Sequence, residues 1–274
     1  MPDAPNRIQV TGRTRLYGVI ADPITHVRAC EVFNPRFEKL GVDAVLVPFH
    51  VHPGELSRAM DGFRALANLG GVLVTIPHKE AVLDVVDEVG AQAQLVGAAN
   101  VFRRESDGRL TAENFDGLGF VAGLRAHGHE PQGKRVLLVG AGGAGKAIAF
   151  ALADARVAEL VVANRSAAKA AALVERVGTA YPQVPVGVGP ATPGGFDLVV
   201  NATSLGLQAG DALPFAVDGL TPATVVADII MKPERTALLA AAEAAGCAIH
   251  YGRPMLDEQV PLMARFLRAF PAAE

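Results

Sequence analysis

The sequence has few cysteines, no long hydrophobic run and no excess of basic residues. Its two cysteines, Cys30 and Cys247, are too few for a disulfide framework and are typical of a reducing compartment. Half of the 274 residues are hydrophobic, yet no run reaches the roughly 18 residues that a membrane span needs. Residues 1–15 lack the apolar core of a signal peptide. A net charge of −3 offers no basic surface for nucleic acid. We therefore expect a cytoplasmic protein that acts on a small molecule, without nucleic-acid or membrane partners.

Apolar runs of strand length alternate with helix-prone segments along the whole chain. Strands are predicted at 16–20, 44–49, 71–75, 97–101 and 110–114, and helices over 28–40, over 53–69 and from 76–80 onward. Residues 181–195 contain four prolines and four glycines and are predicted to be mostly loop. The alternation continues on both sides of a polar segment at 127–134, which predicts an α/β protein with two domains.

The clearest motif lies between Arg135 and Arg165. An apolar strand, Arg135–Val139, runs directly into Gly140-Ala141-Gly142-Gly143-Ala144-Gly145, which fits the G-x-G-x-x-G pattern. An alanine-rich helix at 146–156 and a second apolar run at 160–163 follow. Although glycine turns are common, this context predicts the βαβ unit of a Rossmann domain rather than an ordinary turn.

Each glycine of the motif has an expected task. Gly140 permits the tight turn, Gly142 lets the backbone approach a pyrophosphate, and Gly145 allows the helix to pack closely on the strand. The free N–H groups of the helix start are expected to receive the phosphates.

The end of the second strand indicates which dinucleotide binds. NAD-selective sites usually carry an acid about 20 residues beyond the glycines, whereas this chain has Asn164-Arg165-Ser166 followed by Lys169. A guanidinium, a hydroxyl and an ammonium suit a ribose 2′-phosphate. We predict NADP as the cofactor. The alternatives are NAD, or that Arg165 and Lys169 are only solvated charges.

The motifs, taken in order, resemble the shikimate dehydrogenase family from end to end. The matching residues are Asp22-Pro23-Ile24-x-His26, Val74-Thr75-Ile76-Pro77-His78-Lys79-Glu80, Gly97-Ala98-Ala99-Asn100, Asn114-x-Asp116-Gly117, Gly140-Ala141-Gly142-Gly143-Ala144, Asn164-Arg165, Asn201-Ala202-Thr203, Asp228, Pro233, Thr236, Met255-Leu256 and Gln259.

The resemblance implies a two-domain α/β fold. A substrate-binding and catalytic domain would cover residues 1–117, an NADP-binding Rossmann domain 118–252, and a C-terminal helix at 253–274 would return to the first domain. Members reduce 3-dehydroshikimate to shikimate in aromatic amino acid biosynthesis, generally with NADPH, and some oxidise quinate with NAD. They occur as monomers and as homodimers.

The resemblance also implies the residues of the site. Lys79 and Asp116 match the catalytic pair, while Thr75, Asn100 and Gln259 match substrate contacts. The expected cofactor contacts are Gly140, Ala141, Gly142, Gly143, Ala144, Asn164, Arg165, Ser166, Lys169, Ala202, Thr203, Ser204, Met231 and Gly252.

General chemistry supports the catalytic pair. A lysine in a cleft can exchange a proton with a substrate hydroxyl because burial disfavours its ammonium form, and an aspartate can hold the amine in place. The alternatives are that Lys79 lies on a helix surface and that Asp116 only caps the helix from Gly117.

The loop that holds the substrate carboxylate differs from the family pattern. The family usually has His-Ser-x-Ser-Pro, whereas this chain has His26-Val27-Arg28-Ala29-Cys30. Because a hydrogen bond to a charged group is worth about 1.5–3 kcal/mol, losing both hydroxyls predicts a cost of roughly 3–6 kcal/mol, or about 10²–10⁴ in kcat/KM. Arg28 either replaces these contacts or points to solvent.

Other changes also make the expected pocket more apolar. Val101 stands in place of threonine, Phe115 interrupts the usual Asn-Thr-Asp, and Met231 replaces tyrosine. We expect weak activity on shikimate, or activity on a related cyclic hydroxy acid. The other hypotheses are an NAD-dependent quinate-type dehydrogenase and a non-catalytic protein that senses NADP(H).

Two histidine pairs, His50-x-His52 and His127-x-His129, have the spacing of metal ligands. No cysteine or carboxylate cluster completes either pair, so we predict that both lie in solvated loops and that the protein has no metal site.

Overall fold

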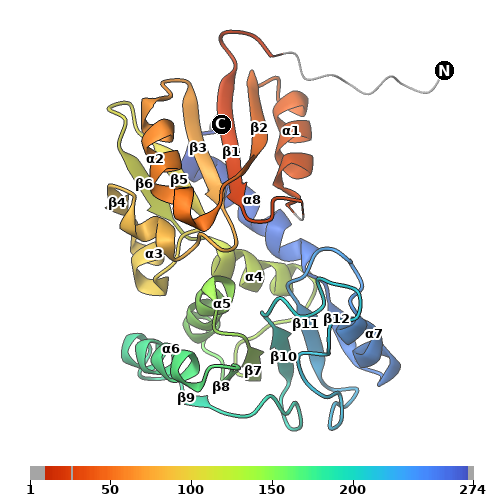
Figure 1. Ribbon diagram of the computed structural model, residues 1–274. Helices are drawn as coiled ribbons and strands as arrows, with labels where there is room; N and C mark the ends of the chain where they lie inside the picture. Colours follow the sequence, from red (N-terminus) through yellow and green to blue (C-terminus); the bar gives the residue numbers. More distant parts are fainter. Residues whose placement is uncertain (1–9, 26, 271–274) are drawn as a thin grey trace, which may run out of the picture. The chain divides into compact units, whose positions relative to one another are not determined.

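The computed structural model describes residues 10–25 and 27–270, which form two compact units (Figure 1). Unit 1 contains the described residues up to Phe115 and from Val260 onward, and unit 2 contains Asp116–Gln259. The predicted domain boundaries lie after residue 117 and after residue 252. The second one marks the start of helix α8 (Arg253–Leu267), but the change of unit falls inside this helix. Sequence signals mark the end of a helix, not the point along it where its packing partner changes.

Unit 1 is built on a six-stranded mixed sheet with the order β2-β1-β3-β5-β6-β4. The strands are β1 (Arg15–Ala21), β2 (Ala44–His50), β3 (Leu69–Val74), β4 (Glu88–Val89), β5 (Val101–Arg104) and β6 (Leu110–Glu113). β1 is parallel to β2 and β3, while β5 is antiparallel to β3 and β6. The helices of this unit are α1 (Ala29–Lys39), α2 (Leu56–Ala65) and α3 (Ala91–Val96). Parallel β1, β2 and β3 therefore end at one edge of the sheet.

Apolar side chains pack α1 and α2 against strands of unit 1. Phe33 and Phe37 of α1 form aromatic contacts with each other, and Phe37 stacks on Tyr17 of β1. Met60 and Phe63 of α2 belong to a separate cluster with Val72 and Phe102.

One helix prediction in unit 1 had the wrong bounds, and another was wrong. The helix predicted over 53–69 is a 3₁₀ turn, Pro53–Glu55, followed by α2, which ends at Ala65 because Leu66 adopts an extended conformation. The helix predicted from 76–80 is a turn followed by a 3₁₀ helix, Ala81–Asp84. The Lys79 carbonyl there accepts the Ala99 N–H at 2.7 Å and so is bound to a distant residue rather than to the next turn of an α-helix. The strand predicted from 97 begins only at Val101.

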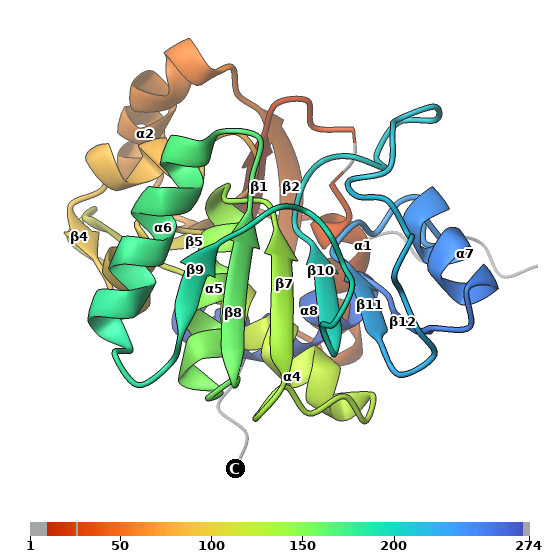
Figure 2. The same cartoon turned by 90° about the horizontal axis from the view of Figure 1, so that it is seen from below.

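Unit 2 contains a six-stranded, all-parallel sheet with the order β12-β11-β10-β7-β8-β9 (Figure 2). The strands are β7 (Arg135–Val139), β8 (Glu159–Ala163), β9 (Val186–Val188), β10 (Leu198–Asn201), β11 (Val225–Asp228) and β12 (Ala248–His250). The helices are α4 (Asp116–Ala126), α5 (Gly143–Asp154), α6 (Ala167–Ala180), α7 (Ala237–Ala244) and the first part of α8. This is the strand order of a Rossmann fold, so the predicted α/β fold class is confirmed.

The segment 181–195 is not entirely loop, since it contains the edge strand β9. β9 has three residues, and among the described residues its one strand partner is β8. Such a short edge strand has no hydrophobic pattern of its own.

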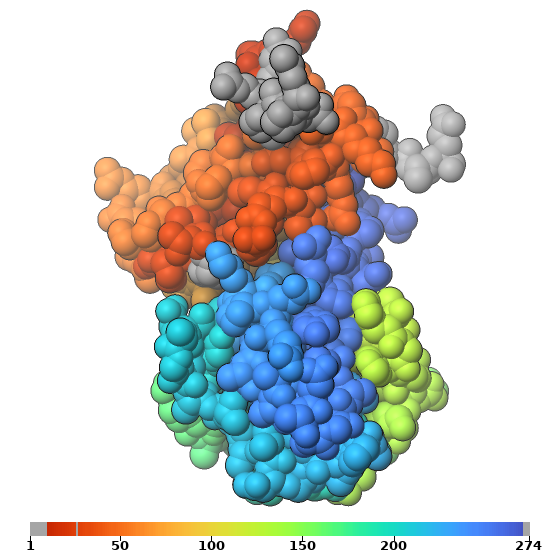
Figure 3. All heavy atoms as spheres, turned by 90° about the vertical axis from the view of Figure 1, so that its right-hand side faces the viewer, coloured from red at the N-terminus to blue at the C-terminus, as the bar shows by residue number. Residues whose placement is uncertain are grey.

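Close contacts between helices in unit 2 depend on glycine. A Cβ at Gly117 of α4 would collide with the Ala147 carbonyl of α5, and one at Gly119 would lie 2.6 Å from the Met255 oxygen of α8. α4 therefore packs against both neighbours almost backbone to backbone. Figure 3 shows the later elements of unit 2 (cyan to blue) on one face, with the yellow-green segment that contains α4 at its edge. No helix within the described residues has the length and apolar character needed to cross a membrane.

Candidate active site

The glycine turn after β7 has the geometry that its motif predicts. Gly140 has a φ of +117°, and a Cβ there would lie 2.7 Å from the Ala202 carbonyl oxygen. A Cβ at Gly145 would collide with the Gly140 carbonyl, which confirms the close packing of helix on strand. Gly142 precedes α5 and faces open space, with no heavy atom within 4 Å of a Cβ built there. This conformation leaves the start of α5 accessible to an anionic group.

Asn164 holds the glycine turn in place. Its Oδ1 accepts the Ala141 N–H at 3.1 Å, and its Nδ2 donates to the Ser166 carbonyl at 3.0 Å. The side chain thus bridges the segments that follow β7 and β8. This arrangement makes Asn164 a positioning residue, while its predicted direct contact with a cofactor stays a prediction.

Positive charge gathers at the start of α6. Ser166 caps this helix by accepting the Lys169 N–H, and the side chains of Arg165 and Lys169 are exposed. Within the described part of the chain, neither cation forms an ion pair. A guanidinium, an ammonium and a helix N-terminus together favour a bound phosphate.

A buried polar network, which the sequence reasoning missed, supports the segments after β10 and β11. The Asp228 carboxylate is 1% exposed and accepts hydrogen bonds from Asn201 Nδ2 at 3.1 Å, the Ile230 N–H at 3.0 Å and Thr236 Oγ1 at 2.8 Å. Burial raises the pKa of Asp228. The sequence signal that could have indicated this network is a polar residue at the end of each of two apolar strands, Asn201 in β10 and Asp228 in β11.

The same network positions the segment Ala202-Thr203-Ser204. The Thr203 N–H and hydroxyl both donate to Asn201 Oδ1, at 3.0 and 2.7 Å. Ala202 is buried, whereas Ser204 is exposed.

All the predicted cofactor residues follow the carboxyl ends of strands in one parallel sheet. Gly140 follows β7, Asn164 follows β8, Ala202 follows β10, and Met231 and Gly252 come shortly after β11 and β12. A Cβ at Gly252 would lie 2.6 Å from the Ile229 and Ile230 oxygens, so only glycine fits there without a shift. Ligands of open α/β sheets bind at this edge.

In unit 1, the structure brings together three predicted residues at the carboxyl end of β3. Thr75 directly follows β3. The Val74 N–H donates to the backbone carbonyl oxygen of Asn100 at 2.7 Å. The Ala99 N–H donates to the Lys79 oxygen at 2.7 Å. Asn100 is 2% exposed and its Oδ1 accepts the Phe115 N–H at 3.0 Å. Thr75, Lys79 and Asn100 therefore share one hydrogen-bonded region of unit 1.

The altered loop lies at the neighbouring end of β1. The Asp22 N–H donates to the Ile76 oxygen at 3.1 Å, which links this loop to the segment after β3. Val27 is half-buried, Ala29 is buried at the start of α1, and Arg28 pairs with Glu31 on the helix surface. His26 of the family motif lies outside the described residues.

Asp116 and Gln259 belong to unit 2. Asp116 is the first residue of α4 and is 3% exposed, while Gln259 in α8 is 6% exposed and donates to the Met255 oxygen at 3.2 Å. A Cβ at Gly119 would lie 2.7 Å from the Gln259 Cβ, so the two helices pack closely near these residues. The pairing of Asp116 with Lys79 stays a prediction.

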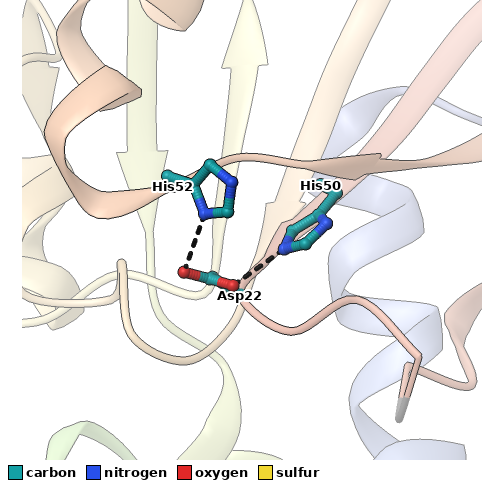
Figure 4. Close-up of side chains that lie close together, drawn as sticks. All are labelled: Asp22, His50 and His52. Atoms are coloured by element: carbon teal, nitrogen blue, oxygen red, sulfur yellow. Dashed lines mark hydrogen bonds and ion pairs between the residues drawn. The ribbon is translucent and has the colours of Figure 1, made fainter.

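The prediction that no carboxylate completes a histidine pair was wrong for His50 and His52. Asp22 bonds to both rings (Figure 4), at 2.8 Å to His50 Nε2 and 3.3 Å to His52 Nδ1. These hydrogen bonds lower the pKa of Asp22. Asp22 lies 28 residues before His50 in the sequence, and the pairing of β1 with β2 brings them together.

The second pair, His127 and His129, packs on a third histidine. Their rings lie 5.4 and 5.7 Å from that of His250, which is 2% exposed. Burial, with smaller contributions from His127 and His129, lowers the pKa of His250 to about 4.

Comparison with known proteins gives a consistent result over most of the chain. Residues 19–102 match the family model of the shikimate dehydrogenase substrate-binding domain, and residues 124–205 match that of shikimate/quinate 5-dehydrogenase. The chain is 42% identical to the shikimate dehydrogenase (NADP(+)) of Rubrobacter xylanophilus over 253 residues, which cover 90% of this chain and 88% of that protein.

Two solved structures have similar folds. The shikimate 5-dehydrogenase of Thermus thermophilus, in complex with NADP(H) and shikimate, is 30% identical with a TM-score of 0.85 and 94% coverage of each chain. The ligand-free 5-ketofructose reductase of Gluconobacter sp. strain CHM43 is 33% identical with a TM-score of 0.83, again with 94% coverage of each chain.

Proposed function

Because the chain belongs to the shikimate dehydrogenase family, we propose that it is an NADP-dependent dehydrogenase that interconverts 3-dehydroshikimate and shikimate or a close relative. The observation that carries this proposal is the hydrogen-bonded region of Thr75, Lys79 and Asn100. Asn100 binds the Phe115 N–H, and Asp116 follows Phe115 in the chain. We propose that Lys79 and Asp116 form the catalytic pair and that Gln259 contacts the substrate.

In this proposal Lys79 transfers the proton. When bound, NADPH would supply a hydride to the carbon of the substrate ketone, and the ketone oxygen would then need a proton. Lys79 donates it from Nζ, and in the reverse direction accepts the proton of the hydroxyl. Asp116 orients the amine, while Asn100 and Thr75 hold the neighbouring substrate groups. General acid–base catalysis of this kind contributes about 10²–10⁴-fold to the rate.

The residues at the edge of the parallel sheet fit NADP. The open space at Gly142 and the free start of α5 suit a pyrophosphate. The exposed cations Arg165 and Lys169 suit a 2′-phosphate, which NAD lacks. We therefore propose a preference for NADP over NAD.

The test of the catalytic proposal is Lys79→Met in the full chain, assayed by reduction of NADP⁺ with shikimate. We expect kcat to fall by about 10²–10⁴-fold with little change in the affinity for NADPH. Lys169→Met is a matched control, because it removes a lysine that we place at the cofactor. It should raise the KM for NADP⁺ and leave kcat nearly unchanged. Full turnover in Lys79→Met would refute the mechanism.

A second candidate substrate is a ketosugar without a carboxylate. Val27 and Ala29 remove two hydroxyls where the family usually has serines, and one similar structure is that of a 5-ketofructose reductase. A panel of shikimate, quinate, 3-dehydroshikimate and 5-ketofructose with both cofactors separates the candidates by kcat/KM. NADPH binding without turnover on the whole panel would instead indicate a non-catalytic sensor.

We also propose that the enzyme works in the cytoplasm, where aromatic amino acid biosynthesis consumes NADPH, as a monomer or homodimer. Analytical ultracentrifugation distinguishes the two assembly states.

A further inference from the structure

We propose that Asp22, His50 and His52 form a binding site for a divalent transition-metal ion on unit 1. The proposed dehydrogenase reaction does not use these three side chains. Each offers one ligand atom, and the three atoms lie within 4.8 Å of one another. Both imidazoles turn toward Asp22, and a ring nitrogen of each faces a different oxygen of the carboxylate (Figure 4).

The distances between the ligand atoms are close to those of a metal complex. Asp22 Oδ1 lies 2.8 Å from His50 Nε2, and Asp22 Oδ2 lies 3.3 Å from His52 Nδ1. With bonds of about 2.0–2.2 Å, a tetrahedral ion holds neighbouring ligand atoms roughly 3.3–3.6 Å apart. Small side-chain movements are therefore sufficient for an ion to replace the two hydrogen bonds.

Parallel strand pairing brings the ligands together. Ala21 at the end of β1 is in register with His50 at the end of β2, so Asp22 emerges beside His50. His52 is two residues further on in extended backbone, which places both imidazoles on the same side. Val51 between them turns into the hydrophobic core and is 8% exposed.

Hydrogen bonds from buried groups hold this backbone. The Val51 N–H donates to the Ala21 oxygen at 3.3 Å, and the Nε2 of His78, which is 1% exposed, donates to the Val51 oxygen at 2.7 Å. The Asp22 N–H donates to the Ile76 oxygen at 3.1 Å. These hydrogen bonds fix the backbone of both segments that carry the ligands, so an ion would find the ligands already arranged.

The donor set selects the class of ion. Imidazole nitrogens suit zinc, copper and nickel, whereas magnesium and calcium prefer oxygen ligands. The side chains of His50 and His52 are 45% and 71% exposed, which gives an ion direct access and leaves coordination positions for water or another ligand. Three protein ligands with an open position are the arrangement of a reactive rather than a closed structural zinc site.

The chain contains a natural control. His127 and His129 have the same spacing as His50 and His52, but they pack on His250. Among the described residues, Asp22, His50 and His52 bring three ligand atoms within 4.8 Å of one another, whereas His127, His129 and His250 do not. Zinc affinity can therefore be compared between variants of the two pairs. The comparison distinguishes a specific site at Asp22, His50 and His52 from the general affinity of histidine pairs for metal.

The experiment is titration of the full chain with ZnCl₂ alone, followed by isothermal calorimetry, with histidine NMR signals recorded in parallel. We expect one ion per chain and changes in the signals of His50 and His52. His52→Ala and Asp22→Asn should each weaken binding at least about tenfold, while the double variant His127→Ala/His129→Ala should bind like the wild type.

His52 is mostly exposed, so its variant is expected to fold, and far-UV circular dichroism checks this. Turnover without added metal should be unchanged in His52→Ala. The proposal is overturned if the wild type does not bind zinc, if the ligand variants bind it equally well, or if binding disappears in the His127/His129 double variant. Loss of the dehydrogenase activity proposed above would leave the binding result unaffected.

Discussion

Acidification should destabilise unit 2 through His250. This residue is 2% exposed, and within the described structure its Nε2 is buried without a hydrogen-bond partner. His127 and His129 approach it from the turn after α4, at ring distances of 5.4 and 5.7 Å. A proton on His250 would therefore be both poorly solvated and close to two groups that also become positive.

The sign of the effect follows from the lowered pKa. The pKa of His250 is about 4 in the folded protein and about 6.5 in the unfolded chain. Between these values the unfolded state binds the proton and the folded state does not, so the free energy of unfolding falls as the pH falls. The loss begins near the unfolded value and is complete below the folded one. From pH 7 to pH 5 it amounts to about 2 kcal/mol, and to pH 4 about 3 kcal/mol.

The comparison that isolates this effect is with His250→Leu, which keeps an apolar side chain of similar size. Asp228, whose pKa burial raises, shifts the stability of unit 2 in the opposite direction, but it does so equally in both proteins. The wild type should lose about 2 kcal/mol more than the variant between pH 7 and pH 5. Hydrogen exchange of the β12 amides in urea measures this difference. Equal losses in the two proteins, or an NMR titration of His250 with a midpoint near its ordinary pKa, would refute the reasoning.

Three variants test other parts of the structure. Arg165→Ala should weaken NADP⁺ binding by about 10–100-fold and leave NAD⁺ binding nearly unchanged, measured by fluorescence quenching or calorimetry; equal losses would exclude a contact with the 2′-phosphate. Thr236→Ala removes the cap of α7 and a hydrogen bond to buried Asp228, so urea denaturation should show a loss of about 1–3 kcal/mol. Val27→Ser with Ala29→Ser should raise kcat/KM for shikimate by up to about 10²–10⁴-fold; no gain would indicate that these positions do not face the carboxylate.

The Rossmann unit was predictable because its signals are local. The strand Arg135–Val139 was predicted with its observed bounds, since its apolar run and the following glycine turn are contiguous in the chain. The tasks of Gly140 and Gly145 also follow from local backbone geometry. Binding of a cofactor by these residues is still a prediction.

Elements that depend on distant contacts were missed. The turn around Lys79 reads as a helix start, but its carbonyl is bound by Ala99, which lies on a different segment. The edge strand β9 exists only because β8 lies beside it. In both cases the deciding hydrogen bond comes from a residue that a local pattern does not contain.

The sequence by itself determined the two-domain α/β class, the glycine turn and the candidate residues Lys79 and Asn100, because periodicity, glycine spacing and motif order are properties of neighbouring residues. Only the tertiary structure decided that Asp22 joins His50 and His52, that His250 is buried beneath His127 and His129, and that Asp228 connects two strands with α7. The physical reason is that these side chains are far apart along the chain. They meet only after parallel strands have paired and brought their carboxyl ends to one edge of a sheet, or after a helix has packed against that sheet.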